Sequence, residues 1–188
     1  PYGKAVHFIG KSGTGKGFLT RVIKELVGIE NVGLIDKLSL IADQDKRHQN
    51  LTARSLIVAQ LDVSGFLSDL GAFYELVDNG SMSGRALHSS EAYEKIWNLR
   101  FLLASLNRLG VENSDERWRR RIIPIPTLGR RPKSSAPDLK KRVRSEELAL
   151  ILGWALSMPR QERDELLFDP QLWGKENRDL QFEQDTHS

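Results

Sequence analysis

The sequence contains no cysteine and no long apolar run. The absence of cysteine excludes disulfide bonds and thiolate metal sites, and it favours a reducing compartment. No stretch approaches the ~18 consecutive apolar residues that span a bilayer, and the first residues do not resemble a signal peptide. We therefore expect a cytoplasmic protein without a membrane partner. The chain also lacks an initiator methionine before its first predicted strand, so we interpret it as part of a longer chain.

Acidic residues are nearly missing from one segment, residues 117–144. This segment contains eleven Lys/Arg and a single acid, Asp138, which leaves seventeen basic and twenty-four acidic residues in the rest of the chain. The formal net charge of +3 therefore hides a concentrated positive segment on an otherwise acidic protein. Such a segment favours a polyanionic partner, with a solvated surface as the alternative.

Glycines are concentrated at residues 10–17, which read Gly-Lys-Ser-Gly-Thr-Gly-Lys-Gly. They match the phosphate-binding pattern G-x-x-x-x-G-K-[ST] at every fixed position except the last. The apolar run 5–9 before them suits a buried strand, and helical periodicity follows over 18–27. Glycines let N–H groups face phosphate oxygens, the helix N-terminus attracts the anion, and lysine binds the outer phosphates. We predict that ATP is bound by Gly10, Ser12, Gly13, Thr14, Gly15, Lys16, Gly17 and Phe18.

Gly17 is the departure from this pattern, because a serine or threonine hydroxyl ordinarily coordinates Mg²⁺ there. Glycine has no hydroxyl, so water or another side chain would have to fill the coordination position. Nucleotide binding is therefore better supported than efficient hydrolysis. The alternative is an ordinary glycine-rich turn between a strand and a helix.

Strands and helices are predicted to alternate, which indicates one α/β domain with a parallel sheet covered on both faces. Residues 36–53 are expected to form a helix followed by an exposed loop, 127–144 to form a loop, and 81–98 have no clear pattern. The core is predicted over 1–158, with 159–188 as a C-terminal helical extension. Strands are expected at 4–9, 31–35, 55–61, 100–106 and 121–126, the last at a sheet edge because of its prolines; helices are expected at 17–27, 66–77, 145–158 and 161–167.

Polar residues follow two of the predicted strands. Asp62 comes directly after the apolar run 56–61, where an acid would hold Mg²⁺ or orient water, or it begins a turn. Asn107 comes after the strand 100–106 and would sense the γ-phosphate, unless it is a turn residue. Arg119, Arg120 and Arg121 precede the last strand. One of them would act on a neighbouring subunit's γ-phosphate, with a surface patch or contacts to nucleic-acid phosphates as alternatives.

Other polar and aromatic residues carry weaker predictions. Arg85, His88 and Lys95 lie in a polar segment that would reach nucleic-acid backbone, although Glu91 and Glu94 stand beside them. The remaining histidines show no metal-ligand spacing and are expected to be structural or exposed. Two tryptophans are expected to pack in the interior rather than to stack on bases. These residues are His7, His48 and His187, and Trp154 and Trp173.

The order of these features resembles that of a known family. Gly-Thr-Gly-Lys-Gly-Phe-Leu at 13–19 is followed by the strand closing on Asp62, by residues 76–88, by Leu-Ala-Ser-Leu-Asn at 103–107, by Arg-Trp-Arg-Arg-Arg-Ile-Ile-Pro-Ile-Pro at 117–126 and by residues 147–156. Over about residues 5–158 this series is similar to the C-terminal helicase domain of phage and plasmid primase–helicases. Those proteins are superfamily 3 helicases of the AAA+ class, related to the poxvirus primase–helicase.

The resemblance implies a P-loop NTPase with a central, mostly parallel sheet flanked by helices. It also implies a ring, usually a hexamer, with ATP and Mg²⁺ at each subunit interface. Such motors move along single-stranded DNA and separate the duplex at a replication fork. The implied location is the cytoplasm of a bacterial host or a virus-infected cell.

Individual roles follow from the same resemblance. Lys16 would bind phosphate, Asp62 would be the second acid of an Asp-Glu pair, and Asn107 would be the sensor. Arg120 or Arg121 would be the arginine finger, and 80–88 would be the pore-facing stretch, with Arg85 as its DNA contact. Three departures concern the Mg²⁺ site: Gly17 lacks the hydroxyl, Leu61 replaces the first acid, and Gln60 places a polar group within the strand.

Three functions are therefore compared. The first is an ATP-driven DNA helicase domain of a mobile-element replication protein. The second is a nucleotide-binding assembly module or DNA clamp without efficient hydrolysis. The third is a P-loop kinase, which is weakened by the basic segment 117–144 and by the lack of an evident acceptor site.

Overall fold

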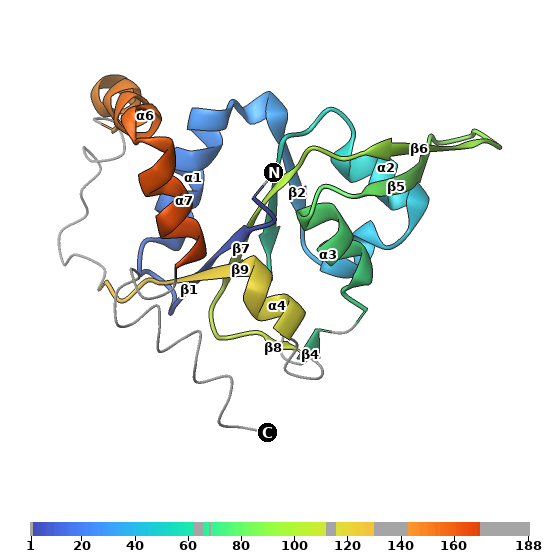
Figure 1. Ribbon diagram of the computed structural model, residues 1–188, viewed down its shortest axis with the longest axis horizontal. Helices are drawn as coiled ribbons and strands as arrows, with labels where there is room; N and C mark the ends of the chain where they lie inside the picture. Colours follow the sequence, from blue (N-terminus) through green and yellow to red (C-terminus); the bar gives the residue numbers. More distant parts are fainter. Residues whose placement is uncertain (1, 62–65, 68, 112–115, 130–142, 170–188) are drawn as a thin grey trace.

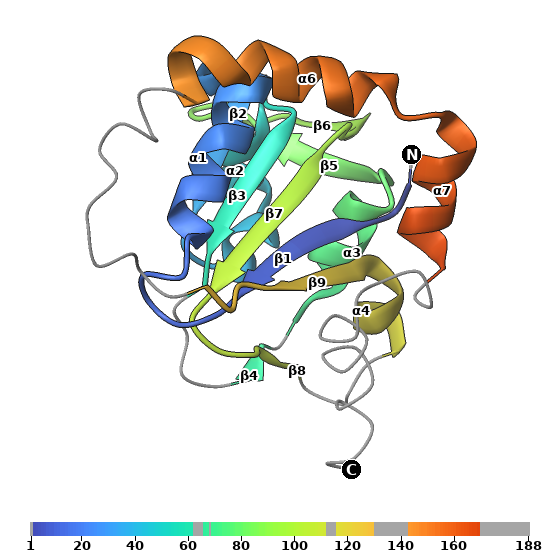
Figure 2. The same cartoon turned by 90° about the vertical axis from the view of Figure 1, so that its left-hand side faces the viewer.

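The computed structural model of the protein describes residues 2–61, 66–67, 69–111, 116–129 and 143–169, and it contains a five-stranded sheet. The strands lie in the order β2-β3-β7-β1-β9 (Figures 1 and 2), and every pairing between neighbours is parallel. The predicted α/β fold with a central parallel sheet is thus confirmed. The strands are β1 (Ala5–Ile9), β2 (Val32–Ile35), β3 (Leu56–Gln60), β7 (Arg100–Ser105) and β9 (Ile122–Pro126).

The sheet is buried on both faces by two hydrophobic clusters. Successive residues of a strand point to opposite faces, and β3 shows the division: Ile57 and Ala59 belong to the larger cluster, whereas Leu56 and Val58 belong to the smaller one. All four are buried. Strands that are covered on both faces need continuous apolar sequence, which is why the runs in the sequence located them.

Helices pack on both faces of this sheet (Figure 1). On one face α1 contributes Ile23 and Val27 to the smaller cluster. On the other face Phe73 of α3 and Trp118 of α4 enter the larger cluster. Among the described residues, no helix is both long enough and apolar enough to cross a bilayer. The helices are α1 (Lys16–Val27), α2 (Gln44–Leu51), α3 (Gly71–Val77), α4 (Glu116–Arg121), α6 (Leu148–Ser157) and α7 (Arg160–Phe168), with short helical segments at η1 (Ile29–Asn31), η2 (Leu38–Ile41) and η3 (Val143–Glu147).

Helix α2 occupies residues that the sequence predicted as an exposed loop. Its composition is polar, but its N-terminus is capped by Asp43. The Asp43 carboxylate accepts hydrogen bonds from the N–H groups of Asp45 at 2.9 Å and Lys46 at 3.0 Å. A capping side chain of this kind stabilises a helix by about 1 kcal/mol. A helix was expected within residues 36–53, and the structure differs in that the polar part, expected as a loop, is also helical because its cap stabilises it.

The helix predicted from residue 66 begins later, at Gly71. Residues Phe66–Leu67 form strand β4, which pairs in parallel with β8 (Gly110–Val111) in a small second sheet. Asp69, between β4 and α3, has a φ of +55°. A non-glycine residue in this left-handed conformation interrupts helical geometry, which accounts for the shorter helix.

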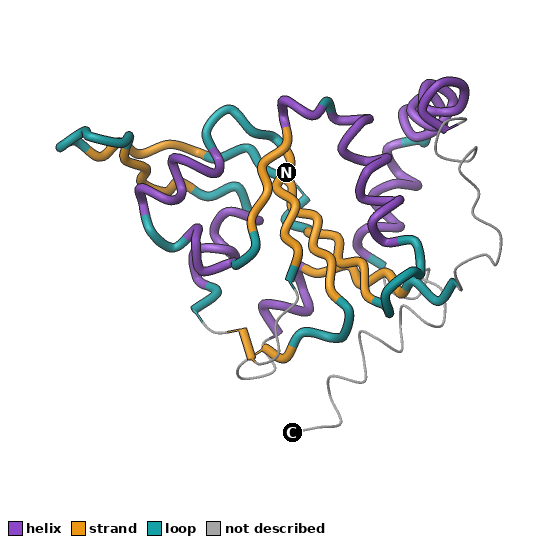
Figure 3. Tube along the Cα trace, turned by 180° about the vertical axis from the view of Figure 1, so that it is seen from behind, coloured by secondary structure: helices purple, strands orange, loops and turns teal. Residues whose placement is uncertain are grey.

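Residues 81–96, for which the sequence showed no clear pattern, form an antiparallel hairpin. Its strands are β5 (Ser81–Arg85) and β6 (Ala92–Ile96), and Ser81 pairs with Ile96 while Arg85 pairs with Ala92. The hairpin projects from the body of the protein (Figures 1 and 3). Trp97 is 1% exposed and anchors the base, where its indole N–H donates to the Met82 carbonyl at 3.0 Å.

The structure of the C-terminal part differs from the sequence-based predictions in two ways. Ser145 was predicted to cap a helix, but it lies inside the segment Val143–Glu147, which is already helical. Trp154 was predicted to pack in the interior, yet it is 68% exposed, and no residue of α6 is buried. The prediction that β9 lies at a sheet edge is confirmed, because it pairs only with β1 in the five-stranded sheet. Trp173 and His187 lie outside the described residues.

Candidate nucleotide-binding site

The loop between β1 and α1 turns through three glycines with positive φ. Gly10, Gly13 and Gly15 have φ angles of +158°, +81° and +102°. A Cβ atom at Gly10 would lie 2.3 Å from Oγ1 and 2.5 Å from the carbonyl oxygen of Thr127, so no side chain fits there. At Gly13 and Gly15 the left-handed backbone itself favours glycine.

Thr127, just after β9, fixes this loop to the neighbouring strand. Its N–H donates to the Ile9 carbonyl at 2.7 Å, and its Oγ1 lies 2.8 Å from the Oγ1 of Thr14. The Thr14 hydroxyl also donates to the Lys11 carbonyl at 2.8 Å. Thr127 was not predicted from the sequence, because its link to the loop depends on β9 lying beside β1, which no motif encodes.

The N-terminus of α1 directly follows the loop. Gly15 is its N-cap, and its carbonyl accepts from the N–H groups of Phe18 and Leu19, each at 3.0 Å. In the described structure no side chain caps this helix, and its first turn has no acidic residue. The positive end of the helix dipole is therefore not offset by a carboxylate, which suits an anion.

Lys16 folds back over the loop. Its Nζ donates to the Lys11 carbonyl at 2.9 Å and also to the Gly10 carbonyl. An ammonium held by loop carbonyls can exchange these partners for phosphate oxygens, which carry more negative charge. This arrangement holds the lysine of the motif at the loop, within the lining of the cavity described next.

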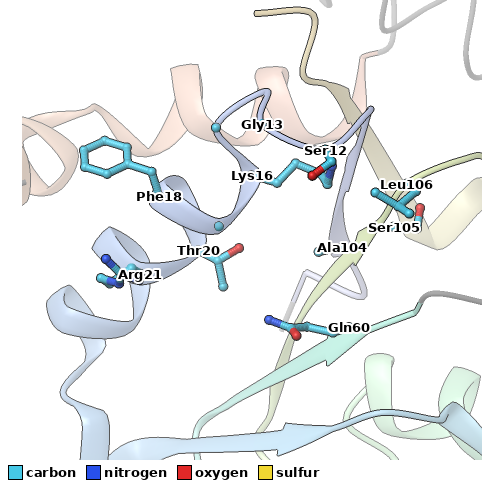
Figure 4. Close-up of a pocket in the computed structure, with 12 residues that line it drawn as sticks. Ser12, Gly13, Lys16, Phe18, Thr20, Arg21, Gln60, Ala104, Ser105 and Leu106 are labelled. Atoms are coloured by element: carbon cyan, nitrogen blue, oxygen red, sulfur yellow. The ribbon is translucent and has the colours of Figure 1, made fainter. Parts of the chain in front are cut away.

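A cavity of about 510 Å³ opens over the loop. This volume lies within the range of small-molecule sites. Figure 4 shows its walls: the loop and α1 form one side, and the ends of β3 and β7 form the other. Its lining residues include Ser12, Gly13, Gly15, Lys16, Gly17 and Phe18 of the predicted site, together with Thr20, Arg21, Gln60 and residues 104–106.

Thr20 and Gln60 are polar residues of this cavity that were not assigned a binding role from the sequence, as are Arg21 and Ser105. Thr20 of α1 is 5% exposed, and its Oγ1 has no hydrogen-bond partner within the described part of the chain. Gln60 ends β3 and is exposed. Both side chains extend into the space between α1 and the strands (Figure 4). A second cavity of about 400 Å³ adjoins the first and shares Thr20 and Gln60.

The tip of β3 is described only as far as Leu61. Leu61 is 1% exposed and its N–H donates to the Ala104 carbonyl at 2.8 Å, so an apolar side chain is packed at the position where the resemblance would place the first acid. Asp62, the predicted magnesium ligand, lies outside the described residues. Groups of three or more His, Cys, Asp or Glu able to hold a metal ion are absent from the described residues.

The tip of β7 contains a buried polar contact. The Ser105 hydroxyl donates to the Asn107 carbonyl and lies 2.8 Å from Nε2 of His7. Because that hydroxyl proton is used, His7 donates through Nε2–H. Burial lowers the pKa of His7 to about 4, so its ring is neutral at neutral pH. Asn107, the predicted sensor, is exposed and is not part of the cavity lining, which includes Ser105 and Leu106.

The arginine cluster forms α4 and lies at the opposite end of the sheet from the loop. Because β9 runs parallel to β1, with Ile122 opposite Ala5, Arg120 and Arg121 are at the amino edge. Arg121 is 6% exposed and binds the Asp78 carboxylate, its Nε lying 3.0 Å from Oδ1. The Asp78 side chain is 43% exposed, so this ion pair is buried only on the side of Arg121. It holds Arg121 within its own chain, and the arginine-finger role of Arg121 stays a prediction. Arg120 is exposed, and its carbonyl accepts from Lys4 at 2.7 Å.

The predicted nucleic-acid residues all lie on the hairpin. Arg85 is paired with Asp45, with Nε–Oδ1 and Nη2–Oδ2 distances of 2.6 and 2.8 Å. The Arg85 guanidinium lowers the pKa of the Asp45 carboxyl by hydrogen bonding. Lys95 lies over the Trp97 ring, 4.2 Å from its centroid. His88 is exposed near the tip, with φ of +63°.

Comparison of the sequence with protein-family models and with characterised proteins gives no match. The fold, in contrast, matches solved structures of the C-terminal region of NrS-1. One apo structure of that region has a TM-score of 0.69 at 14% identity and aligns with 98% of this chain. Another, of residues 305–718, has a TM-score of 0.67 at 17% identity and aligns with 97% of it. The chain spans only 43% and 42% of those two chains, so the likeness establishes a shared fold over about two fifths of them.

Proposed function

We propose that this chain is the ATP-binding motor core of a DNA replication helicase of the primase–helicase type. The observation that carries this proposal is the glycine loop after β1, which presents Lys16 and an uncapped helix N-terminus to a cavity of about 510 Å³. Nucleotides bind at the carboxyl edge of parallel sheets in such a position. The fold shared with the NrS-1 C-terminal region supports the phage primase–helicase assignment. The proposal includes the assignment of this chain to the superfamily 3 helicases of the AAA+ class.

The residues of the loop explain how the phosphates would be held. Backbone N–H groups at Gly13 and Gly15 and the first turn of α1 would bind the β- and α-phosphates. Lys16 would move from the Gly10 and Lys11 carbonyls to the outer phosphates. Mg²⁺ prefers oxygen ligands and retains several waters, and the Thr20 hydroxyl at the cavity fits a metal-bound water. Asp62, outside the described residues, stays the proposed direct ligand from the sequence. Bound Mg²⁺ would neutralise charge that develops on the phosphates.

Arg120 is the proposed arginine finger. It is exposed and stands at the amino edge of the sheet, a strand length from the loop of its own chain. Only the loop of another subunit could therefore receive its guanidinium, as a ring requires. An arginine supplied in this way stabilises the transition-state charge of phosphoryl transfer.

The β5–β6 hairpin is the proposed DNA contact. It projects from the body (Figure 3) and exposes His88 near its tip. Lys95, opposite Met82 near the base of the hairpin, adds a positive charge, and Arg85 would contribute only when its ion pair with Asp45 opens. In a ring such a hairpin would face the central channel, where it would contact the phosphate backbone of single-stranded DNA.

A second candidate function is a nucleotide-binding assembly module without efficient hydrolysis. Two observations favour it: Gly17 supplies no hydroxyl, and Leu61 is buried at the position where the resemblance would place the first acid. The two candidates share the nucleotide site and differ only in turnover.

The test of the shared site is equilibrium binding of ATP in Mg²⁺, followed by steady-state hydrolysis. Lys16→Ala should weaken ATP binding at least about tenfold, because it removes a charge-assisted contact to phosphate. Lys46→Ala on exposed α2, on the other face of the sheet, is the matched control and should bind as the wild type does. Equal affinity of the wild type and Lys16→Ala would contradict the proposed function. Binding without turnover would select the assembly module.

A further inference from the structure

We infer that Thr20, with Gln60, holds water molecules of the nucleotide-bound Mg²⁺ and so replaces the hydroxyl that Gly17 lacks. The inference rests on the proposed ATP site. It assigns the binding of the metal's water molecules to two uncharged side chains, and neither stands at a usual position of the motif.

The first support is the state of the Thr20 hydroxyl. Thr20 is 5% exposed, and its Oγ1 lacks a hydrogen-bond partner in the part of the chain that is described. A buried hydroxyl without a partner is unfavourable unless something else satisfies it. Its side chain extends into the phosphate-loop cavity (Figure 4), so a ligand of that cavity can supply the partner.

The second support is position along α1. Thr20 stands three residues after Gly17, which places both on the same face of the helix. Three residues advance about 4.5 Å along the axis. Because an Mg²⁺–oxygen bond is about 2.1 Å, a hydroxyl moved this far does not replace a direct ligand. A metal-bound water extends the reach by a further hydrogen bond of about 2.8 Å, so the contact is through water.

The third support is Gln60 on the opposite wall. It ends β3, is exposed to the cavity and lines both adjoining cavities together with Thr20. An amide offers an oxygen acceptor to a metal-bound water. The other residues of β3 are apolar and buried. Gln60 is therefore the polar residue of this strand, and it lies at the cavity. Mg²⁺ ordinarily keeps several waters and binds few protein groups directly, which suits two uncharged water-binding side chains.

The experiment measures ATP affinity as a function of the free Mg²⁺ concentration in the wild type and in Thr20→Val. The concentration runs from essentially zero, in EDTA, to about tenfold above the concentration that saturates the wild type. Valine keeps the branched shape and removes the hydroxyl. We expect Thr20→Val to bind ATP in EDTA as the wild type does, and to need about five to ten times more Mg²⁺ for half-maximal enhancement of binding. Gln60→Met should shift the requirement in the same direction.

A rescue variant distinguishes metal binding from packing. A Cβ at Gly17 meets no atom within 4 Å, so Gly17→Ser is sterically allowed. In Gly17→Ser/Thr20→Val the serine hydroxyl should restore the wild-type Mg²⁺ requirement, which a packing defect would not allow. An unchanged Mg²⁺ requirement in Thr20→Val, with ATP binding intact, would overturn this inference alone. Failure of the wild type to bind ATP with or without Mg²⁺ would overturn the proposed function as well.

Discussion

At the scale of single residues, the candidate site combines satisfied and unsatisfied hydroxyls. Thr14 bonds to the Lys11 carbonyl and lies against Thr127, whereas Thr20 has no hydroxyl partner in the described structure. Natural proteins retain an unsatisfied buried group mainly where function uses it. Removal of each hydroxyl should therefore change the free energy of unfolding differently when no nucleotide is present.

Thr20→Val should raise the free energy of unfolding by about 1 kcal/mol without ligand, because it removes a buried hydroxyl that forms no hydrogen bond. Thr14→Val is the matched comparison and should lower it by about 1 kcal/mol, because two contacts are lost. Urea denaturation of the three proteins at pH 7 gives both values. Equal destabilisation by both substitutions would contradict the assignment of Thr20.

His7 should make stability depend on pH. Burial lowers its pKa from 6.5 to about 4 in the folded protein. The unfolded chain therefore takes up the proton first as pH falls, so the contribution is complete above pH 6.5 and is lost between pH 6.5 and 4. The 2.5-unit difference corresponds to about 3 kcal/mol.

The measurement for His7 is urea denaturation at several pH values between 7 and 4. The wild type should lose stability steadily through this range, and His7→Gln should show a flatter dependence. Asp45 does not affect the comparison of slopes between pH 7 and 4, because the Arg85 hydrogen bond lowers its pKa below 3.8. The stabilisation from Asp45 is present above that pH and is lost only at lower pH. Identical slopes for wild type and variant would exclude His7 as the source.

At the scale of elements, Gly10 of the loop and Gly17 in the first turn of α1 differ in the space around their Cα atoms. An alanine at Gly10 would place Cβ 2.3 Å from the Thr127 hydroxyl, whereas at Gly17 it meets nothing within 4 Å. We expect Gly10→Ala to destabilise by about 1–3 kcal/mol through overpacking. Gly17→Ala should stabilise α1 by about 0.5 kcal/mol. Thermal melts should thus shift in opposite directions, and a parallel shift would mean that the loop is not packed on β9 as described.

The elements also show which parts of the fold the sequence could predict. The five sheet strands were found because each is a continuous apolar run or a proline-edged one. The hairpin was missed because β5 reads Ser-Met-Ser-Gly-Arg, which shows no apolar run. Its base is held by Trp97, a buried member of the larger hydrophobic cluster, and this contact is not evident from the sequence. A helix was expected within residues 36–53, but the position of α2 at Gln44–Leu51 was not predicted, because its polar sequence lacks hydrophobic periodicity and its N-terminus is stabilised by the Asp43 cap.

The same limits apply to the site. The loop was recognisable because its residues are contiguous, and the structure gives Gly10, Gly13 and Gly15 the positive φ angles that such a loop needs. Thr127 and the His7–Ser105 contact were not recognisable, because each joins residues about a hundred positions apart. The burial of Arg121 against Asp78 depends on tertiary packing for the same reason.

At the scale of the whole molecule, positive charge is concentrated in residues 117–144, and the rest of the chain has an excess of acidic residues. If these charges bind phosphates of single-stranded DNA, affinity should fall steeply with salt, by a log–log slope of about −0.7 for each phosphate neutralised. Fluorescence anisotropy between about 50 and 200 mM salt measures the slope. An affinity that does not change with salt would remove the basic segment as a DNA contact.

The proposed function depends above all on coupling between the nucleotide site and DNA. The decisive measurement is steady-state ATP hydrolysis in Mg²⁺, with and without single-stranded DNA, on the wild type, Lys16→Ala and Lys46→Ala. A motor should hydrolyse ATP faster when DNA is present, and Lys16→Ala should abolish that stimulation while Lys46→Ala retains it. ATP bound without hydrolysis, whether or not DNA is added, would contradict the motor and leave the assembly module.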